Sequence, residues 1–165
     1  MSLQEMTAYA VDLEPYELAQ AAYVGCQRHI ESVAKGLPDR YGAEKGGWNL
    51  HIEGAAGELA FAKCLNVYWS GSVNTFGEGG DVGQIQVRTR SRHDYELIIR
   101  EKDRDDDVFV LVTGVSPEYV VVGWTFGGIA KAHDEWRKTH GGRAAAWFVP
   151  HEALRPVDEL YEVVA

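Results

Sequence analysis

The sequence has few cysteines, no long apolar run and no surplus of positive charge. Its cysteines, Cys26 and Cys64, lie in segments with helical periodicity and lack the spacing of a metal knuckle, so we expect reduced thiols in the core of a cytosolic protein. The N-terminal sequence carries acidic residues where a signal peptide carries basic ones, and no apolar run nears the roughly 18 residues of a membrane span. We therefore expect a cytoplasmic protein that does not enter a membrane.

The charge balance excludes broad, nonspecific attraction to nucleic acid. The chain has 16 basic and 25 acidic residues and a formal net charge of −9, so its summed field repels phosphates. A site for nucleic acid must therefore be local. The length of 165 residues suits one domain, residues 1–165, and the composition is typical of globular proteins.

Apolar spacing predicts two helices in the first part of the chain. The N-terminal helix spans about residues 14–36, with Pro15 in its first turn. An apolar stripe recurs along it in steps of three and four residues, and we interpret this stripe as core packing: Tyr16, Ala19, Tyr23, Cys26, Ile30, Val33 and Leu37. After a glycine-containing loop, the second helix is expected to begin at Asn49 and to end at Asn66.

Several strands and one further helix are expected after the second helix. A short strand over residues 67–69 precedes a glycine-rich loop, and four strands follow over residues 84–89, 95–99, 108–113 and 119–126. We interpret the charged stretch 100–107 as a solvated turn rather than a calcium loop, because it lacks the alternation and glycine of such a loop. A short helix within 127–142 and an edge strand over 144–149 complete an α/β or α+β domain, in which helices flank a mixed central sheet.

Two acidic residues stand out beside small residues. Glu58 follows Gly54 and Ala55 on the second helix, so the helix can approach the sheet closely and hold this carboxylate partly buried. A buried carboxylate needs a cation, and an ion pair with an arginine is the simplest partner. Asp81 follows two glycines, and the strand after it places Gln84, Gln86, Arg88 and Arg90 on one face. A polar face exposed to solvent explains that alternation without any function.

This order of a helical glutamate, an aspartate after a glycine loop and a polar strand resembles the PD-(D/E)XK nuclease superfamily, including its phage and prophage members. The resemblance spans about residues 50–126 and implies a restriction-endonuclease-like core over about 48–150, in a bacterial or phage-infected cell. It implies that Glu58, Asp81 and Gln86 bind Mg²⁺ or Mn²⁺ for phosphodiester hydrolysis, while Arg88 takes the place of the family's lysine. His51, two turns before Glu58, is a candidate proton shuttle or a simple surface histidine.

Two residues depart from the family pattern. Gln86 offers a carbonyl oxygen but no negative charge, which weakens metal binding. Arg88 does not lose its proton, so it can grip a phosphate but cannot act as a base. The sequence therefore leaves three hypotheses: a metal-dependent nuclease, an inactive relative that binds nucleic acid or a protein partner, and a structural component with a fortuitous motif.

Basic residues are dense only near this strand. Arg90, Arg92 and His93 continue it, and Arg100, Lys102 and Arg104 follow, which is what a local phosphate site in an acidic protein requires. Arg88, Arg90, Arg92 and His93 are therefore our candidate nucleic-acid contacts. We expect DNA rather than RNA as the ligand. Whether the protein forms a homodimer is left open. Neighbouring acids could neutralise this charge, so the direction of the arginines decides the question.

Overall fold

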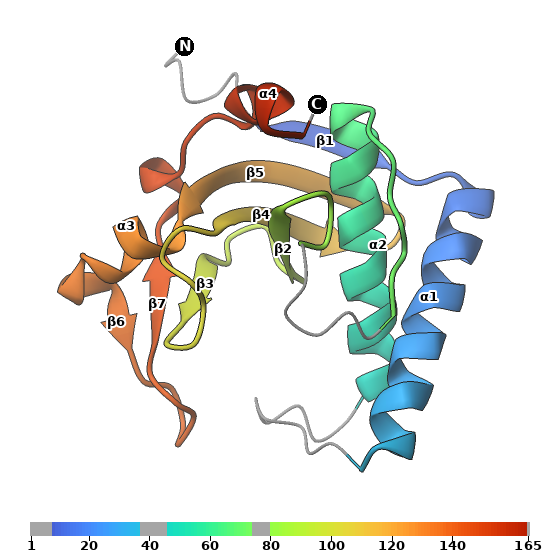
Figure 1. Ribbon diagram of the computed structural model, residues 1–165, viewed down its shortest axis with the longest axis horizontal. Coiled ribbons are helices and arrows are strands. Elements are labelled where there is room, and N and C mark those ends of the chain that lie inside the picture. Colours follow the sequence, from blue (N-terminus) through green and yellow to red (C-terminus); the bar gives the residue numbers. More distant parts are fainter. Residues whose placement is uncertain (1–7, 37–45, 74–79, 165) are drawn as a thin grey trace.

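The computed structural model describes residues 8–36, 46–73 and 80–164 of the chain, and it is a mixed α/β structure (Figure 1). These residues form four α-helices: α1 (Pro15–Ala34), α2 (Gly47–Leu65), α3 (Gly127–Lys131) and α4 (Tyr161–Val164). They also form seven strands: β1 (Tyr9–Asp12), β2 (Ile85–Arg90), β3 (Leu97–Arg100), β4 (Val108–Val115), β5 (Glu118–Phe126), β6 (Arg137–Lys138) and β7 (Ala146–Val149). None of these helices is both long enough and apolar enough to cross a membrane.

The larger sheet has the strand order β1-β5-β4-β2 and mixes parallel with antiparallel pairs. β4 and β5 form an antiparallel hairpin, β1 pairs antiparallel with β5, and β2 lies parallel to β4 at the sheet edge. The four predicted strands correspond to β2, β3, β4 and β5, whereas the N-terminal strand β1 was not expected. Apolar and β-branched residues fill both faces of β4, which is buried from Val108 to Gly114.

The two long helices pack closely against each other beside this sheet (Figure 1). Pro15 opens α1, and the side chains of Glu14 and Glu17 form a capping box there. At Gly25 an added Cβ would lie 2.5 Å from the Ile52 Cα, so only glycine permits this helix contact. α2 starts after Gly46 rather than at Asn49, while Asn66 ends it in the left-handed conformation with φ of 54°, as expected.

A smaller antiparallel sheet has the order β3-β7-β6. β4 separates two clusters of buried side chains, because its residues point alternately to opposite faces. Val108, Val110 and Val112 pack with α2 in the larger cluster. Phe109 and Leu111 pack on the other side with the inner face of the smaller sheet, formed by Leu97, Ile99, Trp147 and Val149.

Three expectations about individual elements were wrong, and a fourth was confirmed in part. Residues 67–69 form no strand, whereas the short helix expected within 127–142 is present as α3 and ends at Lys131. β7 lies at the centre of the smaller sheet instead of an edge, since β6 pairs with its outer side. The apolar stripe of α1 is also not in the core: α1 buries Glu17, Ala21 and Gly25 against α2 instead. Leu37, residues 38–45 and residues 74–79 lie outside the described residues.

Candidate functional site

Glu58 is buried on α2 and bound by an arginine that the sequence did not single out. The guanidinium of Arg28, on α1, donates from Nη1 to Glu58 Oε2 at 2.5 Å and from Nη2 to Glu58 Oε1 at 3.0 Å. The indole nitrogen of Trp69 also donates to Glu58 Oε1, at 3.2 Å. Both carboxylate oxygens therefore accept hydrogen bonds from the protein itself, as the simple ion-pair interpretation of Glu58 expects.

Arg28 is held in place from a second direction. Its Nε and Nη2 atoms donate to the Ser72 carbonyl at 3.0 and 2.9 Å, so the planar fork links α1, α2 and the segment after α2. Burial raises the pKa of Glu58 above its ordinary value, and the nearby Asp81 adds to this effect, although the hydrogen bonds from Arg28 oppose it.

Asp81 lies at the outer edge of β2. Its Oδ2 accepts the Val87 backbone N–H at 2.7 Å, and its own N–H donates to the Ile85 carbonyl at 2.8 Å. Gly80 permits this close return of the chain, because a Cβ there would lie 2.5 Å from the Ile85 backbone. The carboxylate thus satisfies a donor of an edge strand. Burial raises the pKa of Asp81, against the lowering effects of the Val87 N–H, Arg88 and Arg28.

Gln86 and Arg88 lie on the opposite face of β2 from α2. Ile85 and Val87 pack in the cluster with α2, and a Cβ on Gly57 of α2 would lie 1.9 Å from the Thr89 Oγ1. Gln86 and Arg88 alternate with these residues and stand beside Phe109 and Leu111 of β4. The structure therefore brings Glu58 and Asp81 into electrostatic reach of each other, but it does not bring Gln86 and Arg88 to the same side of the sheet as Glu58.

The expected metal site can be tested against these donors. A hard divalent cation takes several oxygen ligands with available lone pairs. Both oxygens of Glu58 are bound by Arg28, an oxygen of Asp81 caps Val87, and the Gln86 amide lies on the other face. Within the described residues no three histidine, cysteine, aspartate or glutamate side chains are placed to hold a metal ion. This arrangement does not fit Mg²⁺ or Mn²⁺ bound by Glu58, Asp81 and Gln86.

His51 contacts another histidine of the helix pair. Its Nδ1 lies 3.1 Å from the Nδ1 of His29 on α1, and the His29 ring lies 4.3 Å from the Trp48 ring. His51 and Glu58 are about 10 Å apart along the helix axis. This contact of His51 belongs to the packing of α1 on α2, and the proton-shuttle role stays a prediction.

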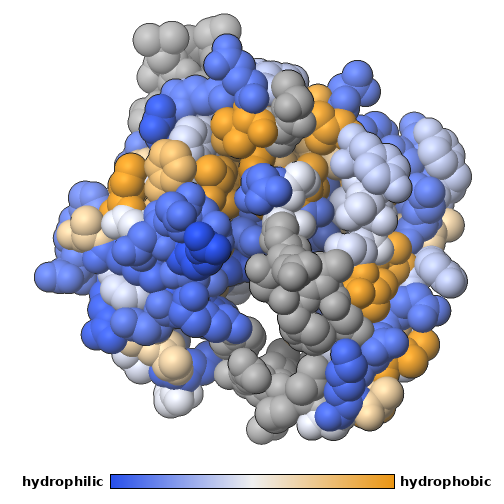
Figure 2. All heavy atoms as spheres, viewed as in Figure 1, coloured by the Kyte–Doolittle hydropathy of each residue, from blue (hydrophilic) through white to orange (hydrophobic). Residues whose placement is uncertain are grey.

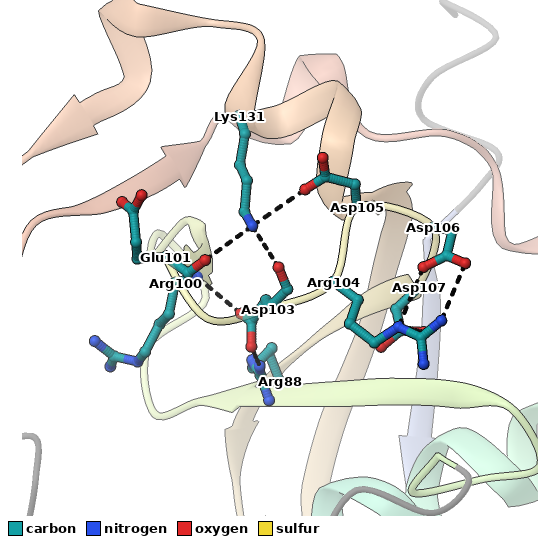
Figure 3. Close-up of polar contacts among 9 residues, drawn as sticks. All are labelled: Arg88, Arg100, Glu101, Asp103, Arg104, Asp105, Asp106, Asp107 and Lys131. Atoms are coloured by element: carbon teal, nitrogen blue, oxygen red, sulfur yellow. Dashed lines mark hydrogen bonds and ion pairs between the residues drawn. The ribbon is translucent and has the colours of Figure 1, made fainter.

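Arg88 reaches into the charged loop between β3 and β4 (Figure 3). Its Nη2 donates to Asp103 Oδ1 at 2.8 Å, and its guanidinium lies 5.0 Å from the centre of the Phe109 ring. The other Asp103 oxygen accepts the Arg100 N–H at 2.8 Å. Lys131 of α3 donates to the carbonyls of Glu101 and Asp103 and pairs with Asp105. The loop neutralises its own charge, and Arg88 is part of that network.

Basic side chains that face solvent gather instead on the outer face of the smaller sheet. A concavity of about 360 Å³ lies there, a volume suited to a small ligand or a single nucleotide. Its basic residues are Arg90, Arg100, Lys138, His140 and Arg143, and its acidic residues are Asp94 and Glu96. Figure 2 shows hydrophilic side chains over this part of the molecule. In a chain with a net charge of −9, this is a local excess of positive charge.

Apolar and aromatic side chains also line this basic concavity. Ile98 and Phe148 are cross-strand partners on β3 and β7, and the His140 ring lies 4.9 Å from the Phe148 ring. Arg90 extends from the end of β2, donates to the Glu96 carbonyl at 2.5 Å and stacks 4.6 Å from the centre of the Tyr95 ring. Among the described residues, no carboxylate forms an ion pair with Arg90, Lys138 or Arg143.

The candidate nucleic-acid contacts thus divide into different environments. Arg90 lines the basic concavity, while Arg88 is bound to Asp103. Arg92 is exposed and bound to Asp94 at 3.0 Å, and the Nδ1 of His93 lies 2.9 Å from the Thr113 Oγ1. Sequence reasoning missed Lys138 and His140, because they belong to a segment expected to be helical, and it missed Arg143, which lies between that segment and the expected edge strand. The glycine pair after His140 was the available indication of a β-hairpin there.

Comparison of the chain with protein-family models, with curated proteins and with solved structures found no match.

Proposed function

We propose that this protein has a restriction-endonuclease-like scaffold and binds single-stranded nucleic acid without cutting it. The preferred ligand is DNA rather than RNA. The observation that carries the proposal is the basic concavity, whose lining includes Arg90, Arg100, Lys138 and Arg143 against two acidic residues, Asp94 and Glu96. Lysine and arginine side chains that neutralise phosphates supply most of the affinity of nonspecific nucleic-acid binding.

The shape and composition of the concavity favour a single strand over a duplex. Aromatic rings that line a basic groove can stack on unpaired bases, and Tyr95, His140 and Phe148 are placed among the basic side chains. The outer face of a small sheet is also a common platform for unstacked bases. A volume of about 360 Å³ accommodates a nucleotide rather than the width of a double helix.

The helical side of β2 supports binding without hydrolysis. Hydrolysis in the family pattern needs acidic ligands and a basic group that meet at one metal ion. Here Glu58 is bound to Arg28, Asp81 caps the strand edge, and Arg88 belongs to the loop network on the other face. The nuclease-like scaffold itself is proposed from the order of α2, the glycine loop, β2 and the β4–β5 hairpin, as the resemblance implies.

The test is fluorescence anisotropy of a labelled single-stranded oligonucleotide at low salt. We expect the wild type to bind, and Arg143→Ala and Lys138→Ala to bind more weakly because each loses a phosphate contact. The matched control is Arg104→Ala, since Arg104 is also an exposed arginine but pairs with Asp106 and Asp107 outside the concavity.

Two outcomes would overturn the proposal. The first is no binding of single-stranded DNA or RNA by the wild type at low salt, or equal binding by all three variants. The second is cleavage of the oligonucleotide that requires manganese and disappears in Asp81→Ala, which would make the protein a nuclease. Cleavage that persists in Asp81→Ala comes from a contaminant and is removed by further purification before binding is measured.

A further inference from the structure

Helix α1 exposes its apolar side chains and buries its small and polar ones. Tyr16, Tyr23, Ile30 and Val33 are exposed by 71%, 68%, 48% and 65%, whereas the buried residues of the helix are Glu17, Ala21 and Gly25. A helix whose function is only to cover a sheet has the opposite arrangement, with its apolar stripe inward. The outward stripe therefore calls for a partner.

The spacing of this stripe is that of a coiled-coil seam. Tyr16, Tyr23 and Ile30 are seven residues apart, and Ala19, Cys26 and Val33 form a second series of the same period between them. An apolar repeat of 3.5 residues keeps one narrow seam turned toward a second helix. We call these residues the α1 seam: Tyr16, Ala19, Tyr23, Cys26, Ile30 and Val33.

The residues that flank the α1 seam carry no carboxylate, lysine or arginine. They are Gln20, Ala22, Gln27, His29 and Ala34. Flanking charges select an oppositely charged partner helix in a coiled coil, and their absence gives such a partner nothing to pair with. Two copies of a chain with a net charge of −9 repel each other, and an uncharged patch is where they can meet at least cost.

We propose that α1 is a dimerisation helix, which pairs with α1 of a second copy of this chain along the α1 seam. A two-fold contact uses the same patch on both copies, and an uncharged apolar seam is complementary to itself. Cys26 lies near the middle of the seam, so pairing in either direction brings Cys26 of the two copies close together. The proposal is independent of nucleic-acid binding.

The test measures molar mass by light scattering from low to high micromolar concentration. We expect the wild type to be a dimer and Ile30→Glu to be a monomer. The matched control is Ile129→Glu, since Ile129 of α3 is exposed by 47% against 48% for Ile30 and lies outside the α1 seam. Circular dichroism checks that both variants are folded.

A second measurement keeps the proposal falsifiable if Ile30→Glu does not fold. In a Cys64→Ser background, a short bis-maleimide should join two copies through Cys26, and Cys26→Ser should abolish this product. A wild type that is monomeric at every concentration would overturn the proposal. So would a dimer that persists in Ile30→Glu and gives no cross-linked product through Cys26. In the first case the seam would instead be covered by another part of the chain or by a different protein.

Discussion

The α2-facing side of β2 and the outer face of the smaller sheet differ in how their charges are used. On the α2-facing side of β2 the charged groups are buried or half-buried and matched: Arg28 binds both oxygens of Glu58, and Asp81 caps the edge nearby. On the outer face of the smaller sheet, Arg90 reaches into the basic concavity, where positive side chains outnumber negative ones. Matched buried charge stabilises a particular fold, whereas unmatched exposed charge is available to a ligand. The contrast predicts that changes on the first face affect stability and changes on the second affect binding.

The largest stability effect is expected when Arg28 is removed. Arg28→Met leaves the Glu58 carboxylate buried without its cation, which should lower the free energy of unfolding by about 3–5 kcal/mol. Urea denaturation measures the change. The double variant Arg28→Met with Glu58→Leu should recover most of the loss, because it removes both charges. A single variant as stable as the wild type would show that water reaches Glu58.

The contact between α2 and β2 should be the next most sensitive. Gly57→Ala places a Cβ 1.9 Å from the Thr89 Oγ1, so the helix or the strand must move, at a cost of about 1–3 kcal/mol. Gly54→Ala is the control in the same helix, since nothing lies within 4 Å of its Cβ position, and it should be neutral or stabilising. Equal effects of the two substitutions in urea denaturation would contradict this packing.

The pH dependence of the free energy of unfolding should reveal how much stability is lost by holding the Asp81 carboxylate away from water at the edge of β2. Burial raises the pKa of Asp81 above its ordinary value of 3.8. An acid whose pKa is raised in the folded state contributes its full stabilisation when the pH is below its pKa in the unfolded state. This contribution is lost as the pH rises through its pKa in the folded state. Relative to Asp81→Asn, the wild type should therefore lose stability as the pH rises above about 4. A relative gain would mean that the Val87 hydrogen bond outweighs burial.

The smallest stability effects are expected on the solvent side. Lys138→Ala and Arg143→Ala should each change the free energy of unfolding by no more than about 0.5 kcal/mol, because both side chains are exposed and form no ion pair within the described residues. Thermal or urea unfolding checks this. A larger loss would show that these residues support the β6–β7 hairpin and are not reserved for a ligand.

Local patterns in the sequence predicted the strands and the alternation of β2. Period-two alternation alone places Gln86 and Arg88 opposite Ile85 and Val87, and it was available from the sequence. Which of these faces α2 would cover was not available, because it depends on the packing of Gly57 against Thr89. The convergence expected for Glu58 and Gln86 failed at that step.

Other features depended on contacts between distant segments. The α1 seam has the same apolar pattern as a helix that packs on its own core, so the sequence could not say which surface covers it. Arg28 could not be chosen from the many arginines as the partner of Glu58. Arg90 and Arg143 meet only because β7 pairs with β3 and places the β6–β7 loop beside the end of β2.

The most direct test of the account is the salt dependence of oligonucleotide binding by the wild type and by the double variant Lys138→Ala, Arg143→Ala. Loss of two phosphate contacts on a single strand should reduce the slope of log affinity against log salt by about 1.4. Gly54→Ala serves as a folded reference and should keep the wild-type slope. An unchanged slope in the double variant would contradict the claim that the protein binds phosphate on the outer face of the smaller sheet.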